Sequence, residues 1–450
     1  MNSEQQYIDL FTSCREMICN HSAAPMNAVR DEAFENFCRL GFPSKKQEEY
    51  RYTDMQAQFA PDYGLNLNRL AIPVDPYEAF RCDVPNLSTL LYFVVNDQPL
   101  LTASHTPHST NGVVIDSLKD YCLKNPDFIG RYYSKIADFT ADGVTALNTV
   151  LAQDGLLVYV PRGIIADKTV QVVNILRSDV DLMVNRRVLI VVEEGAAVKL
   201  LFCDHASDDR PFLATEVVEA FVGRNASLEL YSLEETHYKN TRVSNVYISQ
   251  QADSRVVHNV ITLHNGMTRN TLRLAFKGEG ADCSCNGCVI ADKQQHVDNN
   301  TLIDHQTSHC TSRELYKYVL DDKSTGAFAG KVLVRQDAQK TVSEEVNQNI
   351  CVTREARMFT QPMLEIYADD VKCSHGSTVG QLNEQALFYM RQRGISLKEA
   401  QMMLQVAFVG EVIDKIELIL INREIINQPS LARSLRSLSN LLMTKIINKT

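Results

Sequence analysis

The sequence predicts a mainly β protein, with a parallel β-helix or solenoid at its centre and a helical region at each end. Short β-branched and aromatic runs fill the chain from about residue 87 to residue 366, and a turn returns there at nearly regular intervals. Helical periodicity is mostly confined to the two ends. We therefore expect an N-terminal, mainly helical region over residues 1–85, a β-helix core over 86–370 and a C-terminal helical region over 371–450.

The N-terminal region should contain a helix over residues 28–40. Apolar residues recur there at helical spacing: Val29, Ala33, Phe37 and Leu40. Gly41 then supplies a stop, and Pro43 prevents the helix from continuing. Inside the β region, the stretch "VTALNTVLAQDG" that ends at Gly155 is the helical exception.

A repeat in the β region becomes visible when four turn residues are aligned. They are Gly195, Asn225, Asp253 and Gly280, and successive turns are 30, 28 and 27 positions apart. Three and five residues after each turn comes a mostly apolar pair: Val198/Leu200, Leu228/Leu230, Val256/His258 and Cys283/Cys285. This phasing indicates stacked coils, because a sandwich would not require successive strands to be so similarly placed.

Helical periodicity resumes after residue 380. Asn383 can cap a helix over "EQALFYMRQR", and Gly394 ends it. The segment "SLKE" over 396–399 is a capping box, which predicts a long amphipathic helix running towards Leu420. A last helix is predicted from one leucine stripe: Leu431, Leu435, Leu438 and Leu442.

Composition restricts the class of protein. With 45% hydrophobic and 22% charged residues, the 450-residue chain is typical of a soluble globular protein. Its formal net charge of −10 argues against nucleic acid as a partner, because phosphate binding needs clustered Lys and Arg. No apolar run approaches the roughly 18 residues of a membrane span, so no membrane partner is expected. The start "MNSEQQYIDLFTSCREM" lacks signal-peptide features, which favours the cytoplasm.

The 12 cysteines are too sparse for a disulfide scaffold, and we expect thiols. In "CSCNGC", the repeat places Cys283 and Cys285 where other coils have mostly apolar residues. We interpret Cys283, Cys285 and Cys288 as inward core residues rather than metal ligands.

In "HQTSHC", His305 and His309 have a spacing seen on zinc-binding helices, with Cys310 beside them. The flanking residues indicate strand and turn, and four residues along a strand span about 13 Å, which disfavours a shared ion.

The segment "DDVKCSHGST", residues 369–378, lies where the β region meets the helical tail. Cys373 and His375 are two residues apart and would share one face of a strand. A nucleophile–base pair would need an orienting third group, and none is evident. Ligation of a metal or cluster is chemically easier, because thiolate and imidazole both bind iron. A merely polar strand end is the third interpretation, and the residues alone leave the choice open.

Catalytic templates are missing from the sequence. It contains no GxxxxGK[ST] phosphate loop, so the chain should have no ATP site of its own. It also has no G-x-S-x-G elbow and no H-E-x-x-H pair. We expect a protein that is not an enzyme.

Five long segments together resemble the SufB/SufD family of iron–sulfur cluster assembly proteins. They are "RDEAFENFCRLGFPSKKQEEYRYTD", "NTVLAQDGLLVYVPRG", "QHVDNNTLIDHQTSHCTSRELYKYVL", "LEIYADDVKCSHGSTVGQL" and "LFYMRQRGISLKEA". They span about residues 30–420. The chain is most similar to the SufD branch, because Gly376 follows His375 where SufB proteins tend to have glutamate. Asn347, moreover, stands near the position of a SufB cysteine.

The resemblance implies a right-handed parallel β-helix with flanking helical regions. It also implies a SufBCD complex with a SufB-like scaffold subunit and a SufC-like ATPase, in which nascent iron–sulfur clusters form and are transferred. We would expect a homodimer for the isolated chain. His375 and Cys373 are the expected ligands of a transient cluster shared with SufB, and flavin binding is left open.

The helical tail is the expected docking element for SufC, because aromatic and Arg side chains commonly anchor interfaces. The candidate residues are Phe388, Tyr389, Arg393, Gly394 and Phe408. For Phe408, a helical cap over the open end of the β-helix is an equal alternative. The alternative function is a purely structural clamp that positions SufB and SufC without ligating iron or a cluster.

Overall fold

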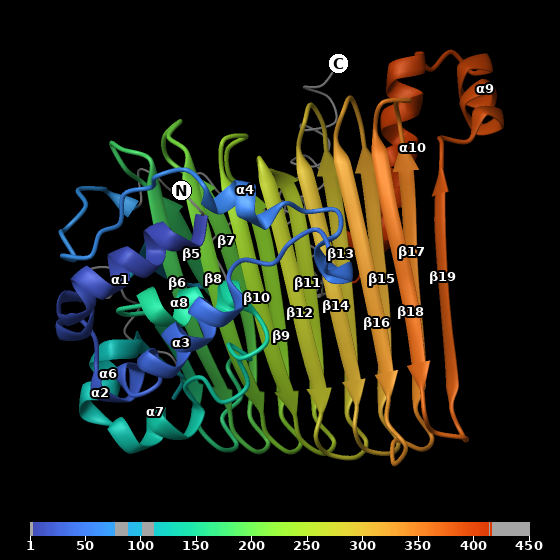
Figure 1. Ribbon diagram of the computed structural model, residues 1–450. Helices are drawn as coiled ribbons and strands as arrows, with labels where there is room; N and C mark the ends of the chain where they lie inside the picture. Colours follow the sequence, from blue (N-terminus) through green and yellow to red (C-terminus); the bar gives the residue numbers. More distant parts are fainter. Residues whose placement is uncertain (1–2, 77–88, 101–111, 414, 416–450) are drawn as a thin grey trace.

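The computed structural model describes residues 3–76, 89–100, 112–413 and 415. In this part of the chain, two long sheets face each other and form an elongated solenoid (Figure 1). Each coil contributes one strand to each sheet, so strand n pairs with strand n + 2 in parallel through most of the solenoid. The predicted parallel β-helix with helices at both ends is confirmed.

The ten-stranded sheet carries most odd-numbered strands. Its strands are β1 (Thr89–Val95), β2 (Gln98–Leu100), β5 (Thr169–Leu176), β7 (Ala197–Ala206), β9 (Ser227–Glu235), β11 (Arg255–His264), β13 (Asp282–Ala291), β15 (Thr311–Leu320), β17 (Val342–Cys351) and β19 (Lys372–Gly380). We call it the odd sheet. Its last strand lies beyond the boundary that we expect at residue 370, and the division into three regions stays a prediction.

The nine-stranded sheet carries most even-numbered strands, and we call it the even sheet. Its strands are β3 (Val114–Ser117), β4 (Leu156–Val160), β6 (Leu182–Val192), β8 (Phe212–Val222), β10 (Thr241–Gln250), β12 (Met267–Phe276), β14 (His296–His305), β16 (Thr325–Val334) and β18 (Arg357–Ile366). Aliphatic side chains from both sheets fill the interior at the N-terminal end.

The residues that the sequence repeat aligns are the residues that pair with one another in the odd sheet. Val198, Leu228, Val256 and Cys283 are successive partners in β7, β9, β11 and β13. The predicted turn residues all have left-handed backbone conformations, with φ between 53° and 71°. Gly, Asn and Asp adopt this conformation at low cost, which explains their return at each coil. The same conformation occurs at His309 (φ 60°) and Lys340 (φ 62°), which extend the repeat by two coils.

The N-terminal helices gather at one end and along one side of the solenoid (Figure 1). They are α1 (Ser3–Asn20), α2 (Ala24–Asn27), α3 (Arg30–Leu40), the single 3-10 turn η1 (Glu48–Tyr50), α4 (Met55–Phe59), α6 (Leu118–Lys124), α7 (Pro126–Tyr132) and α8 (Gly143–Leu151). The predicted helix is α3, and it ends at Gly41 (φ 60°) as expected. The helical exception is α8, which is entirely buried between α3 and the even sheet.

The chain after α3 crosses the outer face of the even sheet. Tyr50 donates a hydrogen bond to Asp142 (2.6 Å), and the Arg269 guanidinium lies 3.9 Å from the centre of the Tyr50 ring. Further along, Tyr52 stacks on Phe359 of β18, with ring centres 4.1 Å apart. The N-terminal region therefore contacts the solenoid almost to its C-terminal end.

The two C-terminal helices, α9 (Glu384–Gln392) and α10 (Leu397–Ile413), have the predicted caps. Asn383 accepts a hydrogen bond from the Ala386 N–H, and Ser396 and Glu399 form the reciprocal capping box. α10 does not cover the end of the solenoid, because it lies on the outer face of the odd sheet, over β13 and β15. The predicted continuation to Leu420 and the leucine-striped helix over 431–442 lie outside the described residues.

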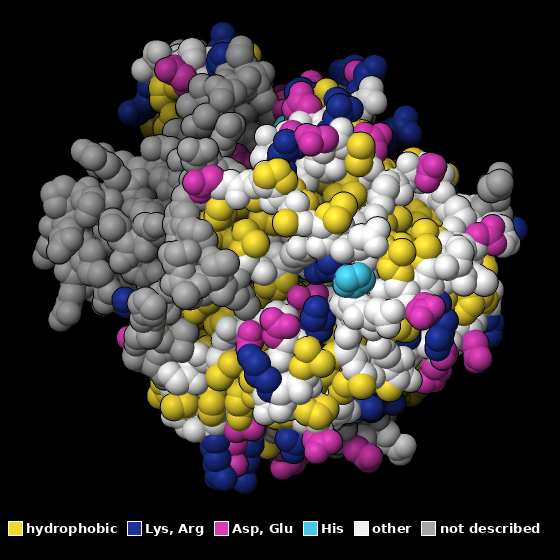
Figure 2. Space-filling view, turned by 90° about the vertical axis from the view of Figure 1, so that its left-hand side faces the viewer, with side chains coloured by type: hydrophobic (Ala, Val, Ile, Leu, Met, Phe, Trp, Pro, Cys, Tyr) yellow, Lys and Arg dark blue, Asp and Glu magenta, His cyan; other side chains and the backbone are white. Residues whose placement is uncertain are grey.

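The face at the N-terminal end of the solenoid carries mixed side chains. Hydrophobic groups are interspersed there with acidic and basic groups (Figure 2). Among the described residues, no helix is long and apolar enough to cross a membrane.

Candidate functional site

The segment 369–378 contributes most of β19, the outermost strand of the odd sheet. Among the described strands, β19 pairs only with β17, and Cys373 aligns with Ser343 while His375 aligns with Glu345. Ser343 and Glu345 are buried in the space between the sheets. Since side chains in register share a face, Cys373 and His375 point to that same side.

The two side chains differ in exposure. His375 is exposed, and a Cβ added to the adjacent Gly376 would have no atom within 4 Å. Cys373 is half-buried against the hydrophobic cluster of Val332, Val334 and Ala368. Burial raises the pKa of the Cys373 thiol above its ordinary value, so the thiol must lose a proton before it can bind metal. One strand edge thus presents an accessible imidazole and a protonated thiol.

We call the surface formed by β18 and β19 the open end. No further described strand pairs with either edge, and several interior-facing apolar side chains lie uncovered or half-covered there: Pro362, Leu364, Ile366 and Val379. Ile366 is 40% exposed and Val379 is 51% exposed. Unpaired edges with apolar groups between them are typical of a surface that another chain covers.

A column of interior positions leads from the open end into the solenoid. It contains successive register partners on five odd-sheet strands: His375, Glu345, Glu314, Cys285 and His258. The next two partners are Leu230 and Leu200. Glu314 and Glu345 were not predicted from the sequence. They stand five residues after His309 and Lys340, so extending the repeat by two turns would have found them.

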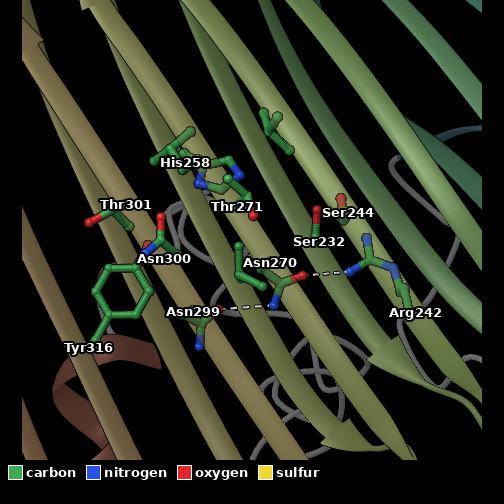
Figure 3. Close-up of a pocket in the computed structure, with 13 residues that line it drawn as sticks. Ser232, Arg242, Ser244, His258, Asn270, Thr271, Asn299, Asn300, Thr301 and Tyr316 are labelled. Carbon is green, nitrogen blue, oxygen red and sulfur yellow. Dashed lines mark hydrogen bonds between the residues drawn. The ribbon is translucent and has the colours of Figure 1, made fainter. Parts of the chain in front are cut away.

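A small polar cavity lies inside the solenoid beside His258. Asn270 connects Arg242 to Asn299 in its wall through hydrogen bonds of 2.8 and 2.9 Å (Figure 3). Neither ring nitrogen of His258 has a hydrogen-bond partner, and burial lowers its pKa to about 4. The cavity has a volume of about 10 Å³, which is room for about one water molecule. It is too small for a substrate-sized ligand.

The candidate partner residues on α9 are exposed. Phe388 is 65% exposed and Tyr389 is 58% exposed. The Arg393 guanidinium lies 4.5 Å from the centre of the Tyr389 ring, and Gly394 has a φ of 85° where the chain leaves the helix. These four residues form an aromatic and basic surface at the end of α9, which we call the α9 surface.

Phe408 differs from that group, because it is half-buried within the chain. Its ring centre lies 4.7 Å from the Lys317 ammonium, and Lys317 also donates to the Phe408 carbonyl oxygen (3.0 Å) and to Glu411. Its ring therefore helps to hold α10 against β15.

The structure buries all three cysteines of "CSCNGC", but they face different sides. Cys283 and Cys285 point into the interior and belong to the main core. The prediction that Cys288 points inward is wrong: it lies in the cluster with Val409 and Val412 of α10, on the outer face of the odd sheet. Because side chains alternate along a strand, and Cys288 stands an odd number of residues from Cys285, the two side chains point to opposite faces of the sheet.

The histidines of "HQTSHC" do not share a site. His305 is buried at the end of β14, where its Nε2 is 2.9 Å from the Ser312 hydroxyl, whereas His309 is exposed on a turn. Across the described residues, His, Cys, Asp and Glu side chains do not converge in groups of three or more that could hold a metal ion. Among these described residues, His375 therefore belongs to no such group.

Comparison with known proteins agrees with this architecture. Residues 175–408 match the family described as "SUF system FeS cluster assembly, SufBD core domain", and residues 1–172 match "SufBD protein N-terminal region". The chain is 27% identical to the iron–sulfur cluster assembly SufBD family protein slr0076 of Synechocystis, over 84% of this chain and 85% of that protein.

Two relatives named iron–sulfur cluster assembly protein SufD are also similar. The Escherichia coli protein is 26% identical over 84% of this chain and 86% of its own length. The Bacillus subtilis protein is 23% identical over 77% of this chain and 79% of its own length. Together, the matched regions cover the solenoid and the N-terminal helices, and the chain belongs to the SufBD family of iron–sulfur cluster assembly proteins.

Proposed function

We propose that this chain is a SufD-like subunit of a cytoplasmic scaffold complex that supports the formation and transfer of nascent iron–sulfur clusters. A SufB-like scaffold subunit and a SufC-like ATPase would complete the complex. The relatives named SufD and the family membership support this assignment. The chain itself would act without catalysis, and the cluster is its cargo.

The observation that carries the proposal is the position of His375. Its imidazole is exposed on the last strand of the solenoid, where the interior column reaches the surface. Ser374 and Gly376 on either side are small, so a partner backbone or an iron atom can approach the ring closely. In the proposal, His375 is the first ligand, and Cys373 is a second or alternative ligand after deprotonation.

The open end is the proposed contact with the SufB-like subunit. A second solenoid that presents its own last coil there would cover Ile366 and Val379 and would pair with the free strand edges. It would also bring the missing cluster ligands next to His375. The isolated chain offers the same surface to a second copy of itself, which accounts for a homodimer without the partner.

The α9 surface is the proposed contact with the SufC-like ATPase. Phe388, Tyr389 and Arg393 are the aromatic and Arg anchors expected of a protein interface, and Gly394 allows close approach at the helix end. Phe408 would contribute indirectly, because it keeps α10 docked and thereby positions α9. The absence of a phosphate loop from the sequence fits a subunit that relies on a partner for ATP hydrolysis.

The test is cluster reconstitution on the complex assembled with both partners. We expect His375→Ala to leave the melting temperature and the association with SufB nearly unchanged, and to lower the bound iron and sulfide at least several-fold. His309→Asn is the matched control: it replaces another exposed histidine, on a left-handed turn that Asn tolerates, and should keep the cluster.

A structural clamp is the second candidate function. It is favoured by the finding that three metal-binding side chains do not converge anywhere in the described residues. In that case His375 makes an ordinary interface contact, and the chain only positions its partners. Unaltered cluster yield in His375→Ala, with an intact complex, would select the clamp.

A further inference from the structure

Glu314 and Glu345 form a buried carboxyl pair inside the solenoid. They are direct register partners on β15 and β17, whose backbones lie about 4.8 Å apart in a parallel sheet. Glu314 is 3% exposed and Glu345 is 0% exposed. None of their four carboxyl oxygens has a hydrogen-bond partner. Two adjacent buried acids without partners are costly, because each loses its hydration without compensation.

Elsewhere in the same interior, two buried carboxylates are neutralised by arginine. Arg186 pairs with Asp204, and Arg242 pairs with both Asp204 (3.1 Å) and Glu216 (2.8 Å). Although burial by itself raises the pKa of Asp204, the two guanidinium groups hold it below its ordinary value. In the described part of the chain, neither Glu314 nor Glu345 forms such an ion pair. The positive charge that the solenoid supplies to Asp204 and Glu216 is missing at Glu314 and Glu345.

The opposite sheet leaves room for the pair. A Cβ added to Gly330 of β16 would lie 2.1 Å from Oε1 of Glu345, so the carboxyl group occupies space that only glycine leaves free. Thr301, the register partner of Gly330 on β14, is 2% exposed, and its hydroxyl has no hydrogen-bond partner. Burial raises the pKa of Glu314, and the nearby Thr301 hydroxyl opposes that rise. The Thr301 hydroxyl is thus another buried polar group without a hydrogen-bond partner beside the two acids.

The pair lies close to the open end. Glu345 is the register partner of the exposed His375, so it lies one strand inside the surface. On the inner side, Glu314 adjoins Cys285. Carboxylate oxygens with imidazole at the entrance suit a divalent first-row metal ion, whose charge would neutralise both acids.

We propose that Glu314 and Glu345 together bind one divalent first-row metal ion, which enters at the open end past His375. The two carboxylates supply the protein ligands, with the Thr301 hydroxyl beside them and water completing the shell. Without the ion, burial raises the pKa of Glu345 to about 9 and that of Glu314 to about 7, so metal binding releases protons. This site is separate from the proposed cluster contact and does not rest on the proposed function.

The test is Mn²⁺ binding to the full chain, measured by loss of the free-ion signal in electron paramagnetic resonance at pH 7.5. We expect one bound ion, with binding at least tenfold weaker in Glu314→Gln and in Glu345→Gln. Glu344→Gln is the matched control, because Glu344 is the next residue on the same strand but is exposed on the other face. It should bind Mn²⁺ as the natural chain does.

Thermal unfolding supplies an independent readout. Mn²⁺ should raise the melting temperature of the natural chain and of Glu344→Gln but not of the two buried Gln variants, which should be folded without metal because the amide is isosteric. His375→Ala should keep the ion, which distinguishes this site from a cluster ligated by His375. Equal Mn²⁺ affinity in all variants, or no binding to the natural chain at 1 mM Mn²⁺, would overturn the proposal.

Discussion

The ammonium group of Lys317 lies 4.7 Å from the centre of the Phe408 ring. Lys317 is on β15, and Phe408 is on α10, so this contact joins the helical tail to the outer face of the solenoid. The tail therefore depends on the solenoid for its position, and deleting residues 383–450 would also expose the apolar outer face under α10. Point substitutions can remove a proposed partner contact without exposing this apolar face, whereas truncation does both.

Phe408→Ala should release α10 from the sheet. Loss of a half-buried ring and of its cation–π contact should lower the free energy of unfolding by about 2 kcal/mol. Urea unfolding measures this, and hydrogen exchange should show faster exchange in β15. Phe388→Ala is the control: its side chain is 65% exposed, and removing it should change stability by less than about 0.5 kcal/mol. Equal stability losses in both variants would contradict the assigned packing.

Phe388→Ala should instead weaken the association with the SufC-like ATPase. An exposed aromatic side chain that anchors an interface contributes at least about 1.4 kcal/mol, which is a tenfold change in the dissociation constant. Calorimetric titration of the purified partners measures it. Leu123→Ala on α6 is the matched control, because Leu123 is 64% exposed at the other end of the molecule and should leave binding unchanged. Unchanged affinity in Phe388→Ala would remove the α9 surface from the proposed interface.

Cys283→Ser should destabilise the protein without affecting metal binding. Its thiol is fully buried in the main core, and a serine hydroxyl there would be unsatisfied at a cost of about 1–3 kcal/mol. Chemical unfolding and metal analysis test this together. Cys38→Ser, at an exposed cysteine, should change neither quantity. Loss of bound metal at unchanged stability would show that Cys283 is a ligand after all.

His258→Leu should make folding less sensitive to acid. Burial, and then the charge of Arg242, lower the His258 pKa to about 4 in the folded chain, against 6.5 when unfolded. The unfolded chain therefore takes up the proton first as pH falls. Neutral His258 therefore makes its full contribution to the free energy of unfolding above pH 6.5. As the pH falls from 6.5 to 4 this contribution is lost, and the free energy of unfolding decreases by about 3 kcal/mol.

Leucine occupies the same register position in the preceding coil, at Leu230, so the interior should accept it at position 258. Unfolding curves between pH 4 and pH 7 should show a flatter pH dependence in His258→Leu than in the natural chain. An unchanged slope would mean that His258 does not take up its proton on unfolding.

Much of the fold could be predicted because its signals are local. The left-handed turn residues Asn225 and Asp253 each stand two residues before a strand, and their spacing is the length of a coil. The caps at Asn383 and Ser396 also depend only on residues three positions away. The prediction for Cys288 failed because it assumes that an apolar position in the repeat points inward, whereas alternation along the strand turns Cys288 to the outer face, which α10 buries.

The sequence by itself determined the coil length, the two helical ends and the position of Cys373 and His375 at the junction between the β region and the helical tail, since turn conformation and side-chain alternation are properties of a few neighbouring residues. Only the tertiary structure decided that Glu345 lies directly behind His375, that Gly330 makes space for its carboxyl group, and that the end of the solenoid is uncovered by described strands. These relationships join residues from different coils and opposite sheets. Such contacts arise from the register and packing of the whole solenoid, and these cannot be inferred from any short segment of the chain.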